Sequence, residues 1–178
     1  LVRRSGNEAD PFPVRTEITS SSAVPTGPAA ISPDGHSLVF VGRAPSGRGT
    51  VLYLRHLDQL TSRAIPGSDD ISPVVFSPDG KWIAGIANLR KIVKIPVDGG
   101  APLALADIGD NGGIDWTSRG DIVVGYGIMD GLKGLFRVTP TGGPLVPLTQ
   151  TDSPPNHLTH DAPRPPAHGR AVHLTHMS

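Results

Sequence analysis

The chain has 178 residues, with 16 basic and 16 acidic side chains and no cysteine. Its 22 glycines and 19 prolines amount to about twice the usual share of these residues, while aromatic residues make up only 4%. This composition excludes a helical bundle, a disulfide framework and a thiolate metal site, and the balanced charge argues against binding to nucleic acid. Short strands between many turns are predicted.

The chain begins with Leu1 and not with methionine, and Leu1–Phe12 has neither the apolar region nor the cleavage site of a signal peptide. We therefore expect a fragment of a longer protein. Val14–Thr19 is a candidate outer strand in an N-terminal lead-in. Apolar stretches such as Trp82–Ala87 are much shorter than the roughly 20 residues that cross a bilayer, so no membrane span is expected within the chain.

A repeat follows. Ile31–Gly35 recurs as Phe76–Gly80 after 45 residues, and a weaker third copy, Trp116–Gly120, follows after another 40. In Ser-Pro-Asp-Gly the proline fixes φ, the aspartate bonds to nearby backbone, and the glycine supplies a positive φ, so the element predicts a hairpin turn. The residues expected to form structural turns in the repeats are Ser32, Pro33, Asp34, Gly35, Ser77, Pro78, Asp79, Gly80, Gly99, Gly100, Gly120, Gly142 and Gly143.

Strand candidates follow each turn at similar distances. They are Ser37–Val41 with Val51–Leu54, Trp82–Ile86 with Ile92–Ile95, and Asp121–Gly125 with Leu135–Val138. Two Gly-Gly turns then lead to short outer runs at Leu103–Ala106 and Leu145–Leu148. The strands are apolar at nearly every position, which predicts that neighbouring sheets cover both of their faces.

Four short strands in every 40 to 45 residues predict an all-β fold, a partial β-propeller of about three four-stranded blades stacked face to face, with irregular termini. The expected division is a lead-in at 1–28, blades at 29–72, 73–112 and 113–154, and at 155–178 a degenerate start of a fourth blade or a disordered tail. The end blades then need neighbours, either missing blades of the same protein or further copies of the chain.

No catalytic, cofactor-binding or metal-binding residue is predicted. Five histidines lie near the C-terminus, at His157, His160, His168, His173 and His176, but prolines separate them and only Asp161 is a candidate partner, so a solvated tail is favoured over a zinc site. Asp34 and Asp79 are expected to be turn residues and not an acid–base pair.

Other candidates also have simpler interpretations. The glycine-rich Gly109–Gly113 is interpreted as a loop between blades and not as a phosphate or calcium site. Ser20–Ser22 and His36 form no recognisable nucleophile–base arrangement. Trp82 and Trp116 are predicted to pack between blades, with ligand stacking as the less favoured alternative.

The Ser-Pro-Asp-Gly units, the segment Val51–Asp58 and the turn Asp98–Gly100 resemble the WD40-like (PD40) repeats of TolB-like β-propellers. Their order, with Val14–Ile18 before the first repeat, is similar to that of the propeller sensor region in membrane-anchored bacterial serine/threonine kinases. The resemblance covers roughly Pro13–Gln150. The kinase motifs themselves are absent from the chain, as is the G-x-S-x-G element of the peptidases that carry a similar propeller.

The resemblance implies a non-catalytic scaffold for protein interaction or ligand sensing, a fragment of such a kinase sensor region. The alternatives are a TolB-like periplasmic component of the cell envelope and the lid propeller of a prolyl-oligopeptidase-type peptidase. An extracytoplasmic location follows from the likeness. Proteins or small molecules are the expected partners, on end faces where Arg43–Gly49, Ser68–Ser72 and Ile128–Gly134 gather.

Overall fold

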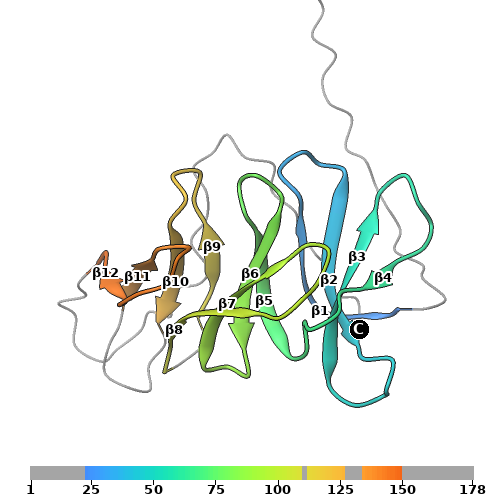
Figure 1. Ribbon diagram of the computed structural model, residues 1–178, viewed down its shortest axis with the longest axis horizontal. Coiled ribbons are helices and arrows are strands. Elements are labelled where there is room, and N and C mark those ends of the chain that lie inside the picture. Colours follow the sequence, from blue (N-terminus) through green and yellow to red (C-terminus); the bar gives the residue numbers. More distant parts are fainter. Residues whose placement is uncertain (1–22, 110–111, 127–133, 150–178) are drawn as a thin grey trace, which may run out of the picture.

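The computed structural model describes residues 23–109, 112–126 and 134–149. All regular secondary structure in these residues is β-strand, which confirms the all-β prediction. Their twelve strands form three antiparallel four-stranded sheets, which stand side by side in chain order (Figure 1). No helix in this part of the chain has the length and apolarity needed to cross a membrane.

Each sheet, or blade, is one continuous stretch of chain in which every strand pairs with the next. Blade 1 contains β1 (Pro25–Ile31), β2 (Ser37–Arg43), β3 (Thr50–His56) and β4 (Arg63–Ala64). Blade 2 contains β5 (Ile71–Phe76), β6 (Trp82–Ala87), β7 (Lys91–Pro96) and β8 (Leu103–Asp107). Blade 3 contains β9 (Ile114–Trp116), β10 (Ile122–Tyr126), β11 (Gly134–Val138) and β12 (Val146–Pro147).

All the strands predicted between residues 37 and 148 overlap one of these strands. The division of the chain into units at residues 29, 73 and 113 stays a prediction, as do the assignments of the two ends. The candidate strand Val14–Thr19, the tail at 155–178 and its five histidines lie outside the described residues.

Blade 2 is covered on both faces, as its continuous apolarity predicts. Alternate residues of β6 and β7 turn to opposite sides: Ile83, Val93 and Ile95 pack against blade 1, and Ala84, Ile86 and Ile92 against blade 3. Five of these six side chains have no exposed area. Complete burial of one isoleucine contributes roughly 1.5 to 3 kcal/mol, so these two layers hold the stack together.

Main-chain hydrogen bonds also join neighbouring blades, at the Gly-Gly turns between the third and fourth strands. Gly100 N donates to Pro66 O of blade 1, and Gly143 N donates to Leu105 O of blade 2, both at 3.0 Å. Contact is so close at the first junction that a Cβ on Gly67 would lie 2.1 Å from Gly100 O. These glycines therefore do more than reverse the chain, because they also join one blade to the next.

In blades 2 and 3, one face of the sheet packs on the preceding blade, and we call this the back face. The back face of blade 1 differs from the other two. Strand pairing places Arg55 at the repeat position of Ile95 and Val138. Arg55 is only 4% exposed; its Nε donates to Gln59 O at 3.0 Å, and one terminal nitrogen has no hydrogen-bond partner among the described residues. An apolar cluster that includes Phe40 and Tyr53, whose rings stack at 5.6 Å, lies on the same face.

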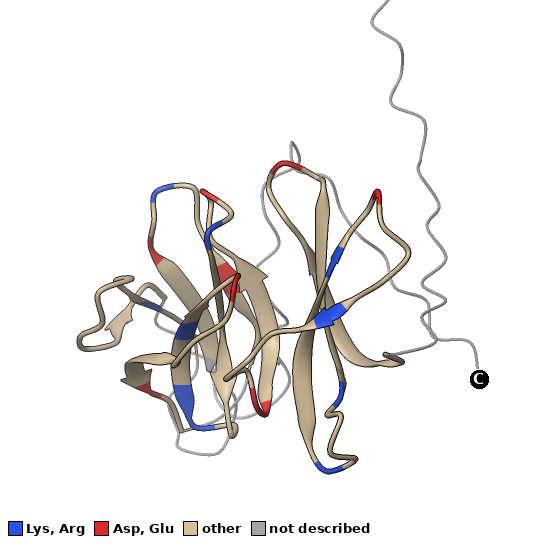
Figure 2. Cartoon of the chain, turned by 45° about the vertical axis from the view of Figure 1, so that its right-hand side comes forward, with Lys and Arg blue, Asp and Glu red and all other residues tan. Residues whose placement is uncertain are grey.

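The three blades do not close on one another in Figure 1, so the described chain is an open, partial β-propeller. Acidic and basic residues are interspersed along the described part of the chain (Figure 2).

Candidate functional site

The turns Ser32–Gly35, Ser77–Gly80 and Thr117–Gly120 lie along one edge of the three sheets, at the top of Figure 1, which we call the turn edge. In the second turn, Ser77 Oγ donates to Asp79 Oδ1 at 2.5 Å and accepts from Trp82 N at 2.9 Å, and Asp79 also accepts from Lys81 N at 3.1 Å. Gly80 closes the turn with a φ of 69°. The chain cannot easily shift here, because side chains satisfy its backbone donors.

The first turn repeats this arrangement. Ser32 Oγ donates to Asp34 Oδ1 and accepts from Ser37 N, and Asp34 accepts from His36 N. The Ser32 hydroxyl and then the His36 N–H hold the pKa of Asp34 below its ordinary value of 3.8. The same two kinds of donor lower the pKa of Asp79. Both carboxylates are thus committed to their own turns.

The third turn has no aspartate inside it, and its first residue is bonded to the residue four positions later instead of five. Thr117 replaces the serine, and both its N–H and its hydroxyl donate to Asp121 O. The indole N–H of Trp116 donates to Gly120 O at 3.0 Å, which fixes the ring beside the turn. The departure that the sequence shows in this repeat therefore has a structural counterpart.

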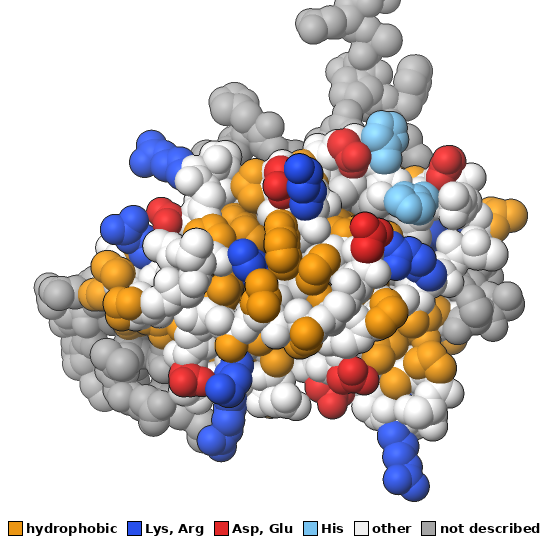
Figure 3. Space-filling model, in the orientation of Figure 1, with side chains coloured by type: hydrophobic (Ala, Val, Ile, Leu, Met, Phe, Trp, Pro, Cys, Tyr) orange, Lys and Arg blue, Asp and Glu red, His pale blue; other side chains and the backbone are white. Residues whose placement is uncertain are grey.

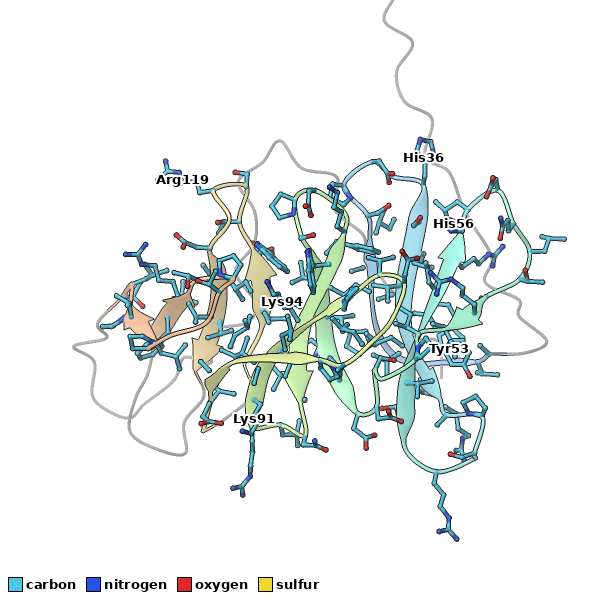
Figure 4. The ribbon with its side chains drawn as sticks, in the orientation of Figure 1. His36, Tyr53, His56, Lys91, Lys94 and Arg119 are labelled. Atoms are coloured by element: carbon cyan, nitrogen blue, oxygen red, sulfur yellow. The ribbon has the colours of Figure 1, made fainter. Side chains whose placement is uncertain are left out.

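A hollow of about 350 Å³ opens between blades 2 and 3 beside the second and third turns. Trp82 and Lys94 line it from blade 2, and Trp116, Arg119 and Pro140 line it from blade 3. Figure 4 shows Lys94 on the middle sheet and Arg119 at the third turn. In the space-filling view, a basic side chain lies among apolar side chains over the middle sheet (Figure 3).

The Lys94 ammonium lies over the Trp82 ring, 4.4 Å from the ring centroid. This geometry gives a cation–π attraction of about 0.5 to 1 kcal/mol at a partly exposed site. Trp116 belongs to the apolar cluster between blades 2 and 3, and Trp82 packs against that cluster, which fits the prediction that both rings pack between blades. The sequence analysis did not predict Lys94 as a site residue. Its position singles it out, because strand pairing aligns it with Leu54 of blade 1, which is buried.

A second hollow of about 350 Å³, lined by His36, His56, Asp58 and Gln59, lies at the turn edge of blade 1. Here Ser37 Oγ and His56 Nδ1 are 2.9 Å apart (Figure 4 labels both histidines). Within the described chain, no acidic group bonds to the other ring nitrogen of His56, so the third member of a nucleophilic triad is missing. Nor do the described residues bring together three histidine or acidic side chains suited to a metal ion.

The loops expected to gather at an end face lie at the edge opposite the turns. Arg43–Gly49 and Ser68–Ser72 do meet there, because a Cβ on Gly49 would lie 3.0 Å from Asp70 Oδ1, which accepts a hydrogen bond from the next residue, Thr50, at 3.0 Å. All but the last residue of Ile128–Gly134 lies outside the described residues. Every glycine among the predicted turn residues has a positive φ, and Gly99 N and Gly142 N close the turns that precede β8 and β12.

Comparison with known proteins supports the fold. A protein assigned as TolB from Agrobacterium tumefaciens superposes with a TM-score of 0.55 at 24% identity, over 69% of this chain and 46% of that protein. TolB from Acinetobacter baumannii gives 0.57 at 16% identity, over 76% and 34%. The chain therefore spans less than half the length of either protein.

No protein-family model matches the chain, and no curated protein matches it. At these identities the similarity is one of fold. The chain has the fold of a TolB-like β-propeller, represented by three of its blades.

Proposed function

We propose that this chain is part of a non-catalytic propeller scaffold that binds a partner protein at its turn edge. The observation that carries the proposal is the hollow between blades 2 and 3, which two indole rings, Lys94 and Arg119 line beside turns held rigid by their own hydrogen bonds. Aromatic and arginine side chains contribute most of the energy at many protein interfaces.

The TolB fold likeness favours a binding component of the cell envelope, outside the cytoplasm, as the setting of this scaffold. Origin in the sensor region of a membrane-anchored serine/threonine kinase is a second proposal, supported by the order of the repeats, and the lid of a serine peptidase is a third. Coding sequence on both sides of this segment discriminates among them. A signal peptide and a small N-terminal domain upstream would support the cell-envelope component. A kinase domain and membrane anchor upstream would support the kinase sensor, and a hydrolase domain downstream would support the peptidase lid.

Binding at the turn edge is tested by capturing partners from a cell-envelope extract on the immobilised chain. We expect at least one protein to be retained by the unaltered chain and lost with Arg119→Ala, since Arg119 is exposed beside the hollow. Arg48→Ala, in the loop between β2 and β3 at the opposite edge, is the matched control and should retain it. A set of captured proteins that does not change with Arg119 contradicts the proposal.

A further inference from the structure

We propose that the hollow between blades 2 and 3 binds a carboxylate side chain of the partner, with the Lys94 ammonium as its receptor. The inference rests on the proposed function and deepens it, because it assigns the partner's chemistry: a short acidic segment that also carries proline or an aromatic residue. The argument begins with the position of Lys94 in the repeat.

Strand pairing identifies the residues equivalent to Lys94. It lies opposite Ala84, just as Leu54 lies opposite Val39 in blade 1 and Arg137 opposite Val123 in blade 3. Leu54 is 2% exposed and belongs to the core between blades 1 and 2. The repeat therefore directs this position toward the next blade along the chain, and blades 2 and 3 place a cation there.

Blade 3 supplies its own counter-ion for this cation. Arg137 lies 3.3 Å from the carboxylate of Asp121, the first residue after the third turn. The equivalent residue after the second turn is Trp82, since Trp82 O and Asp121 O each accept the first backbone N–H of their turns. Blade 2 therefore has an indole ring where blade 3 has a carboxylate.

Lys94 is consequently a half-buried cation without an acidic partner in the described residues. Asp79, the carboxylate that lines the same hollow, accepts from Ser77 Oγ and Lys81 N within its own turn. A carboxylate in the hollow would lie beside Lys94, and Arg119, which also lines the hollow, is likewise without an acidic partner in this part of the chain. Charge-assisted hydrogen bonds of this kind are roughly twice as strong as neutral ones.

The walls of the hollow indicate what accompanies the carboxylate. Trp82, Trp116 and Pro140 present rings on both sides of the seam between the blades. Rings of this kind stack favourably on aromatic side chains and proline. A hollow of about 350 Å³ accommodates side chains of a short segment and not a folded domain.

Two peptides test the inference directly: Ac-Pro-Glu-Phe-Glu-Pro-NH2 and its neutral counterpart Ac-Pro-Gln-Phe-Gln-Pro-NH2. The chain has two tryptophans, so their two indole N–H signals in NMR spectra report binding. We expect saturable shifts of both signals with the glutamate peptide, with a Kd below about 1 mM. The glutamine peptide should bind about tenfold more weakly, and added salt should weaken only the glutamate peptide.

Variants on a single strand then locate the receptor. Lys94→Gln should weaken the glutamate peptide about tenfold, whereas Lys94→Arg should retain it because the cation remains. Lys91→Gln is the control. Lys91 is paired with Asp107 at the first residue of β7, at the edge opposite Arg119 in Figure 4, and it does not line the hollow, so this substitution should leave peptide binding unchanged. A cooperative unfolding transition verifies that each variant folds, with a small loss of stability in Lys94→Gln because its contact with Trp82 is removed.

Equal binding of the two peptides, no binding of either, or unchanged affinity in Lys94→Gln would overturn the inference. If partner capture still depends on Arg119 in that case, the proposed function stands and only the acidic chemistry is wrong. If capture also shows no such dependence, the proposed function fails as well.

Discussion

Asp34 and Asp79 each occupy a turn in which a hydroxyl and a backbone N–H favour the ionised carboxylate, so the pKa of each lies below 3.8 in the folded chain. Their contribution to stability is fully present above pH 3.8 and is lost as the pH falls through the lowered folded-state values. We expect the Asp34→Asn, Asp79→Asn double variant to lose less stability than the unaltered chain between pH 4 and 2. Urea unfolding across this range measures it, and parallel losses in the two proteins would contradict the assignment.

Ser77 links two strands through one buried hydroxyl, which donates to Asp79 and accepts from Trp82 N. Ser77→Ala leaves that N–H without its acceptor, and we expect the free energy of unfolding to fall by about 1 to 2 kcal/mol. Ser118→Ala, at an exposed position of the third turn, should change it by less than about 0.5 kcal/mol. Equal effects in urea unfolding would show that the hydroxyl has no special role.

The junction between elements of different blades is tested at Gly67. Gly67 and Gly47 have nearly the same φ, 81° and 77°, but a Cβ on Gly67 would collide with Gly100 O whereas none of the atoms around Gly47 lies within 4 Å of its Cβ position. Gly47→Ala should cost about 1 to 2 kcal/mol from backbone strain alone. Gly67→Ala should cost at least twice as much, because blade 2 must move. If urea unfolding shows similar decreases in the free energy of unfolding for both variants, the close contact between the blades at Gly67 does not contribute to stability.

At this scale, the sequence predicts local features well and distant ones poorly. The Ser-Pro-Asp-Gly repeat locates the hairpins because its residues act on their own backbone within five positions. The interblade bonds are invisible to such reasoning, since Gly100 meets Pro66 only after both sheets have formed. Lys94 was overlooked for a similar reason: its significance lies in a comparison among three sheets and not in a motif.

At the scale of the whole molecule, blade 1 has a distinctive back face. Arg55 is buried where blades 2 and 3 have aliphatic residues, and one of its nitrogens has no partner within the described part of the chain. Because an unpaired buried polar group is costly, Arg55→Met should raise the free energy of unfolding by about 1 kcal/mol. Arg63→Met, which breaks an exposed ion pair with Asp98, should change it by less than about 0.5 kcal/mol. A lower free energy of unfolding in Arg55→Met would contradict this prediction and would show that the buried guanidinium stabilises the fold.

The Gly-Gly junctions have a consequence for how such a chain grows over generations. Each junction bonds one backbone N–H to one backbone carbonyl, so its hydrogen bond needs no particular side chain in the adjoining unit, although the close approach at the first junction needs a glycine such as Gly67. A duplicated unit that carries both glycines can therefore dock on its parent at once and accumulate substitutions afterwards. Blade 1 has Gln59 and Leu60 at the corresponding positions, so it is suited to open a series of copies and poorly suited to be inserted within one.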